Sequence, residues 1–159
     1  MKLPMLFVCE DNGLAIHASP QDRHGYQEIT EVVKQFYCHV YQSDSTDPEE
    51  IYTLAQKALQ ESQENSQPAF LHLKYHRYLE HVGVFQDFDT GYRSRQEFEE
   101  WEKRDPIKLQ RAKLLDLGLI SIVEQLEEEI NSQVMANLHL AKQAPFVEHN
   151  CLYHGVYHE

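Results

Sequence analysis

The alternation of short apolar runs with segments of helical periodicity most constrains the fold of this chain. The run "PMLFVC" is continuously apolar and stops at the turn residues "EDNG", which predicts a fully buried strand of a parallel sheet. Further strands are expected at "CHVYQSD" and "AFLHLKY", each preceded by a helical segment. The order strand, helix, strand, helix, strand predicts right-handed βαβ units and an α/β fold with about three parallel strands and crossover helices.

The two crossover helices are predicted over residues 26–37 and 45–62. The second has Thr46 or Asp47 as its cap and Pro48 in its first turn. Apolar residues at helical spacing mark the faces expected to be buried. They are Ile29, Val32, Val33 and Phe36 in the first helix, and Ile51, Leu54, Ala55, Ala58 and Leu59 in the second.

The second half of the chain is predicted to be a long surface loop followed by helices. The loop covers residues 79–92 and contains Gly83 and Gly91. One helix is expected to begin at Ser94, with Glu97 at the capping-box position. A second begins at "DPI" and stops at Gly118, and a long third covers residues 121–142. Its apolar stripe comprises Ile122, Val123, Leu126, Ile130, Val134 and Leu138.

Composition and charge exclude several functional classes. The 159 residues include 14 Lys and Arg against 26 Asp and Glu, a net charge of −12, which disfavours binding to nucleic acid or anionic membranes. Three widely spaced cysteines give neither a disulfide framework nor a zinc motif, so we expect a reducing, cytoplasmic environment. The first apolar run is too short for a signal peptide, and nothing later reaches the length of a membrane span.

The end of the first strand is a candidate ligand site. In open α/β sheets, ligands bind at the carboxyl ends of the strands, where "EDNG" lies. The side-chain oxygen of Asn12 and a backbone carbonyl of the following turn suit magnesium bound with a phosphate. Asp-Asn-Gly is also ordinary turn sequence, so both interpretations stay open at this point.

A second segment, "KYHRYLEHVGVFQDFDTGYRSRQEFEEWEKRDPI", carries a resemblance to a known family. Together with "KLPMLFVCEDNGLAI", it resembles the carboxyl-terminal half of the alpha subunit of thiamine diphosphate-dependent 2-oxo acid dehydrogenases, the decarboxylating first component. The first strand looks like a family strand that ends in Asn-Asn, with Asp11 in place of the first Asn and Asn12 matching the second. The segment "RYLEHVG" looks like the family's Tyr-Arg-x-x-x-His, and "GYRS" and "DPI" follow in the family's order.

The resemblance assigns roles to four residues. It implies that Asn12 binds magnesium through its side chain and Leu14 through its backbone carbonyl. His81 matches an active-site histidine near the cofactor diphosphate, where it donates a hydrogen bond and assists proton and acyl transfer. Arg77 matches an arginine that steadies the loop and counts among the cofactor-binding residues. Val82 replaces the serine that is phosphorylated in kinase-regulated complexes, so no phosphorylation is expected there.

The resemblance also implies a domain layout, cofactors and partners. Residues 1–92 would form part of a doubly wound thiamine diphosphate-binding domain with a phosphate loop at 79–91, and residues 93–159 a helical hairpin and docking tail. The family's Gly-Asp-Gly strand end, which supplies a further magnesium ligand, has no match here. We therefore expect a split-gene product, a truncated reading frame or a remnant that needs the amino-terminal half. The other implied partners are a beta subunit and a lipoyl carrier, in an oligomer.

Two functions remain from the sequence. The first is an enzyme portion, inactive alone, that takes part in oxidative decarboxylation of a 2-oxo acid; the second is a non-catalytic module that binds related subunits. The sequence does not identify the 2-oxo acid. His72 and His76 have i, i+4 spacing, but on a strand they lie too far apart for one ion, which favours a structural role. The tail histidines His149, His154 and His158 could bind a metal with Cys151, although docking of the tail is favoured.

Overall fold

The computed structural model describes residues 3–88 and 90–156. Its internal contacts divide the chain into two compact units, residues 1–112 and residues 113–159. Each unit is described by itself. The predicted division of roles at residues 92 and 93 stays a prediction.

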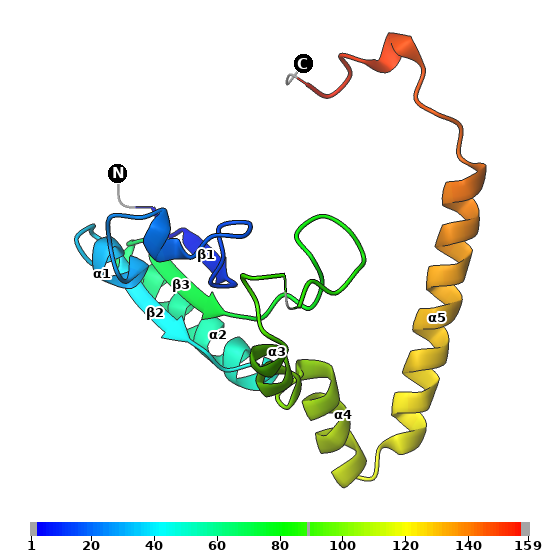
Figure 1. The fold of residues 1–159 in the computed structure, drawn as a ribbon, viewed down its shortest axis with the longest axis horizontal. Helices are drawn as coiled ribbons and strands as arrows, with labels where there is room; N and C mark the ends of the chain where they lie inside the picture. Colours follow the sequence, from blue (N-terminus) through cyan, green and yellow to red (C-terminus); the bar gives the residue numbers. More distant parts are fainter. Residues whose placement is uncertain (1–2, 89, 157–159) are drawn as a thin grey trace. The chain divides into compact units, whose positions relative to one another are not determined.

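A parallel three-stranded sheet forms the centre of the first unit (Figure 1). The strands are β1 (Leu6–Asp11), β2 (His39–Ser43) and β3 (Ala69–Lys74), in the order β1-β3-β2. Leu6 of β1 and His39 of β2 both pair with Ala69. The register therefore brings the carboxyl ends of β1, β2 and β3 to one edge of the sheet. The predicted strands and their parallel arrangement are confirmed.

Helix α2 (Pro48–Asn65) packs against β2 and β3. Its first turn is capped by Asp47, whose side chain accepts a hydrogen bond from the Glu49 N–H at 3.0 Å. On its inner face Ala58 is completely buried, and Glu61 accepts a hydrogen bond from the Tyr41 hydroxyl at 2.5 Å. The predicted helix is therefore confirmed, and of its two predicted caps, Thr46 and Asp47, the cap is Asp47.

Three predictions of burial were wrong in this unit. Phe7 and Val8 of β1 are about half exposed, because β1 is an edge strand of the described sheet and α2 packs mainly on β3 and β2. Leu59 is also exposed. Helix α1 is only Ile29–Val33, because the N–H groups of Gln35 and Phe36 bond to the carbonyls three residues back and close turns there; Phe36 lies outside the helix and is exposed.

The remaining helices follow the predicted order, and two short 3₁₀ helices were not predicted. These elements are the short 3₁₀ helices η1 (Pro20–Asp22) and η2 (His149–Cys151), and the helices α3 (Arg95–Glu102), α4 (Pro106–Asp116) and α5 (Ile120–Gln143). Ser94 caps α3 by accepting the Glu97 N–H at 3.1 Å. Gly118, with a φ of +74°, ends α4 in the left-handed conformation that favours glycine. Both predicted signals are confirmed.

The apolar stripe of α5 is largely exposed within the described residues. Val123 is buried, whereas Ile122, Leu126, Ile130, Val134 and Leu138 are exposed. The tail side chains Leu152, Tyr153 and Val156 are exposed as well, and Tyr157 lies outside the described residues. Periodicity located the helix correctly, but it does not identify what covers the stripe.

Candidate functional site

The turn after β1 is built from two consecutive side-chain-to-backbone hydrogen bonds. Asp11 Oδ1 accepts the N–H of Gly13 at 2.8 Å, and Asn12 Oδ1 accepts the N–H of Leu14 at 3.0 Å. Gly13 has a φ of +68°, a conformation that glycine adopts without steric cost. The turn therefore holds the side chain of Asn12 and the backbone of Leu14 close together.

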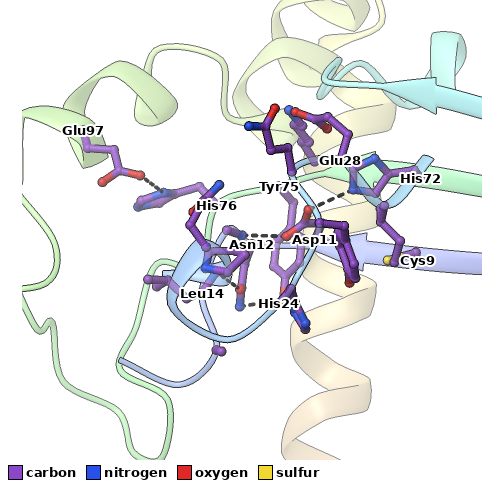
Figure 2. A pocket seen from close by; sticks show the side chains of 18 of the residues that line it. Cys9, Asp11, Asn12, Leu14, His24, Glu28, His72, Tyr75, His76 and Glu97 are labelled. Carbon is purple, nitrogen blue, oxygen red and sulfur yellow. Dashed lines mark hydrogen bonds and ion pairs between the residues drawn. The ribbon is translucent and has the colours of Figure 1, made fainter. Parts of the chain in front are cut away.

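Asp11 is held by a partner from the neighbouring strand. Its Oδ2 lies 2.8 Å from Nε2 of His72, which is buried in the middle of β3 (Figure 2). Partial burial by itself raises the pKa of Asp11, but the Gly13 N–H and His72 outweigh this effect and hold the pKa below its usual value. Asp11 is therefore an ionised hydrogen-bond acceptor at neutral pH.

Two adjoining cavities lie at the carboxyl ends of β1 and β3. The first, of about 370 Å³, includes Asp11, Asn12, Tyr75 and Trp101 in its lining. The second, of about 400 Å³, includes Arg77. Asn12, Gly13, Leu14, His76 and Glu97 line both. This is the edge at which α/β sheets bind ligands.

A buried charge network closes the second cavity on the side of the loop 79–91. Asp87 Oδ1 accepts from Arg93 Nη1 at 2.8 Å, and Asp87 Oδ2 accepts from Arg77 Nη2 at 3.2 Å. The Tyr92 hydroxyl also donates to Asp87 Oδ2, and Arg93 donates to the backbone carbonyl of Arg77. Asp87 and Arg93 are both buried. The network ties the two ends of the loop together.

His76 connects this network to helix α3. Its Nε2 accepts a hydrogen bond from Arg93 Nη2 at 2.9 Å, and its ring stacks on Trp101 with centroids 5.8 Å apart. Burial lowers the pKa of His76 to about 4, and the Arg93 guanidinium adds to the lowering. His76 is therefore neutral at pH 7, with its hydrogen on Nδ1, which lies 3.9 Å from Glu97 Oε1.

Three of the four predicted site residues meet in the second cavity, and the fourth does not. Asn12, Leu14 and Arg77 line it, whereas His81 is exposed and is not among its lining residues. His81 lies in a small loop that the Glu80 N–H closes by donating to the Phe85 carbonyl at 2.9 Å. Its neighbour Val82 is also exposed.

Comparison with known proteins decides the family. The sequence profile described as "Dehydrogenase E1 component" matches residues 1–150. The chain belongs to the dehydrogenase E1 component family. The resemblance recognised in the sequence is thereby confirmed.

Curated relatives agree with the E1 assignment. The chain is 26% identical to the pyruvate dehydrogenase E1 component subunit alpha of Rickettsia felis, over 98% of this chain and 47% of the relative. It is 27% identical to the 2-oxoisovalerate dehydrogenase subunit alpha of Bacillus subtilis, over 85% and 40%, and 30% identical to the pyruvate dehydrogenase subunit of Porphyra purpurea, over 86% and 38%. The E1 chain thus spans less than half the length of these relatives.

The donor set of the E1 chain fits part of a magnesium site. The Asn12 carboxamide oxygen and the Leu14 carbonyl are hard oxygen ligands in one turn, and the Asn12 oxygen has a second lone pair beyond the one bonded to the Leu14 N–H. Magnesium prefers about six oxygens, so these two would be completed by phosphate oxygens, water or other protein groups. Among the described residues, no group of three His, Cys, Asp or Glu side chains could hold a metal ion.

The other histidine candidates form no metal site among the described residues. His72 and His76 bond to Asp11 and Arg93 respectively, in agreement with the structural role predicted for them. Of the tail residues, His149 and Cys151 lie in η2, and His158 lies outside the described residues. No helix in the described part of the E1 chain combines the length and apolarity needed to cross a membrane.

Sequence reasoning missed the residues that hold the site together. Tyr92 and Arg93 belong to the motif "GYRS" and Asp87 lies in the predicted phosphate loop 79–91, but no role was assigned to their side chains, and their partners lie up to 17 residues away in the case of His76 and Arg93. A usable signal was present for His72. A histidine inside the otherwise apolar run "AFLHL" needs a buried hydrogen-bond partner, and Asp11 provides it.

Proposed function

We propose that this E1 chain supplies part of a thiamine diphosphate and magnesium site in the alpha subunit of a 2-oxo acid dehydrogenase. One observation carries the proposal: in a member of the E1 family, Asn12, Leu14 and Arg77 line one cavity at the carboxyl ends of β1 and β3. The reaction class is oxidative decarboxylation of a 2-oxo acid with acyl transfer to a lipoyl carrier. The relatives' names include both pyruvate and 2-oxoisovalerate dehydrogenases, so the particular acid stays open.

Each proposed site residue has a role that follows from its position. Asn12 Oδ1 and the Leu14 carbonyl would hold the magnesium ion beside the phosphates. Thiamine diphosphate, when bound, supplies the electron sink for loss of carbon dioxide. Arg77 is fixed by Asp87 and would anchor the loop that covers the phosphates. His81 would donate a hydrogen bond near the reacting carbon, which requires the loop to bring it in from its exposed position.

The proposal includes partners. Two oxygen ligands hold magnesium weakly, so further ligands are expected from an amino-terminal half of the alpha subunit, whether as a separate polypeptide or as part of a longer chain. A beta subunit and a lipoyl carrier complete the reaction, and the assembly is an oligomer. The exposed Phe7 and Val8 on β1 support a partner at this edge of the sheet. The cysteines are free thiols, which suits the cytoplasm.

A second candidate function is a non-catalytic module that binds related subunits. It is favoured by the exposure of His81 and by the small number of magnesium ligands in this segment. In that case the fold and the partner surface are retained, but the chemistry is not.

Isothermal titration of thiamine diphosphate with Mg²⁺ separates the two functions. The chain is measured alone, and then mixed with a candidate amino-terminal half and beta subunit. We expect binding in the mixture only, strongly weakened by Asn12→Ala and His81→Ala. A matched control is Asn65→Ala, which removes a carboxamide on α2, far along the chain from the proposed ligands. Assembly of the mixture without cofactor binding would reject the enzyme function and leave the module.

A further inference from the structure

We infer that Asp11 and His72 form a positioning pair that fixes the turn in which Asn12 and Leu14 are presented to the metal. The inference rests on the proposed function, and it names two residues to which the resemblance assigns no role. Figure 2 shows the two side chains in contact between β1 and β3. Neither residue needs to touch the cofactor, so both act through the turn.

The geometry places Asp11 between a rigid strand and the turn. In the parallel register His72 pairs with Cys9, two residues before Asp11, so its imidazole reaches along β1 to the end of the strand. Asp11 Oδ2 bonds to His72 Nε2 and Asp11 Oδ1 bonds to the Gly13 N–H, both at 2.8 Å. One carboxylate oxygen thus bonds to the sheet and the other bonds to the turn.

The central position of β3 makes His72 a firm support. The strand lies between β1 and β2, and the exposed fraction of His72 is 1%. A carboxylate only accepts hydrogen bonds, so His72 Nε2 carries the hydrogen of this bond. A His72 side chain fixed by packing therefore holds the Asp11 carboxylate in one orientation.

The orientation of Asp11 in turn affects the ligands. The Asp11 bond holds the N–H of Gly13, and Gly13 is the residue between the two proposed ligands. The next bond joins Asn12 Oδ1 to the Leu14 N–H. If Asp11 Oδ1 were removed, Gly13 would lose the bond that holds its left-handed conformation, and the Asn12 oxygen and the Leu14 carbonyl would no longer keep a fixed relation.

Stability alone gives a poor account of the pair. Nδ1 of His72 is buried without a hydrogen-bond partner, and burial of an unsatisfied polar atom is unfavourable. An apolar side chain in the run "AFLHL" would avoid this penalty. The pair is therefore better explained by control of the turn than by a contribution to packing.

Four variants test the pair. Asp11→Leu and His72→Leu remove the hydrogen bonds and keep apolar volume. Asp11→Asn retains an acceptor for the Gly13 N–H, and His72→Gln retains a donor of similar reach. Tyr41→Phe is the matched control, because it deletes a side-chain hydrogen bond to Glu61 that lies on β2 and not beside the turn.

The first measurement is the Mg²⁺-dependent affinity for thiamine diphosphate in the completed alpha–beta assembly. We expect Asp11→Leu and His72→Leu to weaken it by about 10- to 100-fold, the range found for residues that orient metal ligands. Asp11→Asn and His72→Gln should restore it to within a few-fold of wild type, and Tyr41→Phe should leave it unchanged. Equal affinity in wild type and both Leu variants, with Asn12→Ala still impaired, would overturn the inference.

The second measurement needs no cofactor. Nitrogen-15 NMR of the full chain reports the Gly13 backbone amide and the Asn12 side-chain amide. His72→Leu should shift both resonances and speed hydrogen exchange at Gly13, whereas Tyr41→Phe should not. Unchanged Gly13 and Asn12 signals would reject the pair even if the cofactor binds. If the wild-type assembly failed to bind cofactor while the NMR shifts appeared, the proposed function would fail and the positioning would stand.

Discussion

His76 should make the stability of this protein fall between pH 6.5 and pH 4. Its pKa is lowered from the ordinary value of 6.5 to about 4 in the folded protein, chiefly by burial. Within this window the unfolded chain takes up a proton that the folded chain does not, so the free energy of unfolding decreases as the pH falls. The effect on stability is absent above the unfolded pKa and is complete below the folded pKa.

The magnitude follows from the two pKa values. Full titration over 2.5 units corresponds to about 3 kcal/mol, and the change between pH 7.5 and pH 5.0 is about 2 kcal/mol. The substitution His76→Gln removes the titrating group and keeps a hydrogen-bond acceptor for Arg93. The difference in free energy of unfolding, wild type minus variant, should therefore become more negative by about 2 kcal/mol between these pH values.

Urea unfolding followed by tryptophan fluorescence is a direct assay. Trp101 is the sole tryptophan of the chain and stacks on the His76 ring. Low protein concentration is needed because the sequence pI of about 5.2 lies within the window. Phe98→Leu is the control, since it perturbs the same aromatic cluster but replaces no titrating group. It should lower the free energy of unfolding by the same amount at both pH values. A wild-type minus His76→Gln difference that does not vary with pH would refute the burial of a neutral His76.

Two further predictions concern the core and the loop. Leu71→Ala removes a buried side chain from the central strand and should lower the free energy of unfolding by about 2–5 kcal/mol in urea titrations; a loss below 1 kcal/mol would contradict its burial. Asp87→Asn leaves Arg77 and Arg93 without their shared carboxylate, a loss of about 3–5 kcal/mol for a buried pair. Trypsin should then cleave the variant faster than wild type after these two arginines, while cleavage after the exposed Lys103 stays unchanged. If the ratio of variant rate to wild-type rate were the same at all three sites, the result would count against the network.

The fold was predictable where local chemistry determines it. Asp47 before Pro48 and Ser94 before α3 are cap residues whose side-chain oxygens bond the first turn in any context, and both caps are present. Exposure was less predictable. The apolar sequence of β1 predicts that Phe7 and Val8 are buried against another element. Whether that element belongs to this chain depends on strand order, which hydrophobic periodicity does not encode.

The candidate site was predictable in part for a similar reason. Asn12 and Leu14 are separated by a single residue, and Arg77 follows a strand that ends at the same edge, so motif order was enough to place them together. The support of Asp11 by His72 spans 61 positions and depends on the register of β1 against β3. Sequence alone gives no register between strands, so this partnership required the structure.

The strand order also determines when the sheet can form during synthesis. β1 and β2 each pair with β3 and not with one another, and β3 is the last of the three to be made. Before the growing chain reaches Ala69, β1 and β2 of the described sheet therefore have no partner strand from this sheet. The pairings of β1 and of β2 with β3 then each require the closure of a long connecting segment. Closure of a long segment is slower than the pairing of neighbouring strands through a hairpin. Pairing with β3 leaves Phe7 and Val8 about half exposed, so a partner chain at this edge would protect them both during synthesis and in the folded protein.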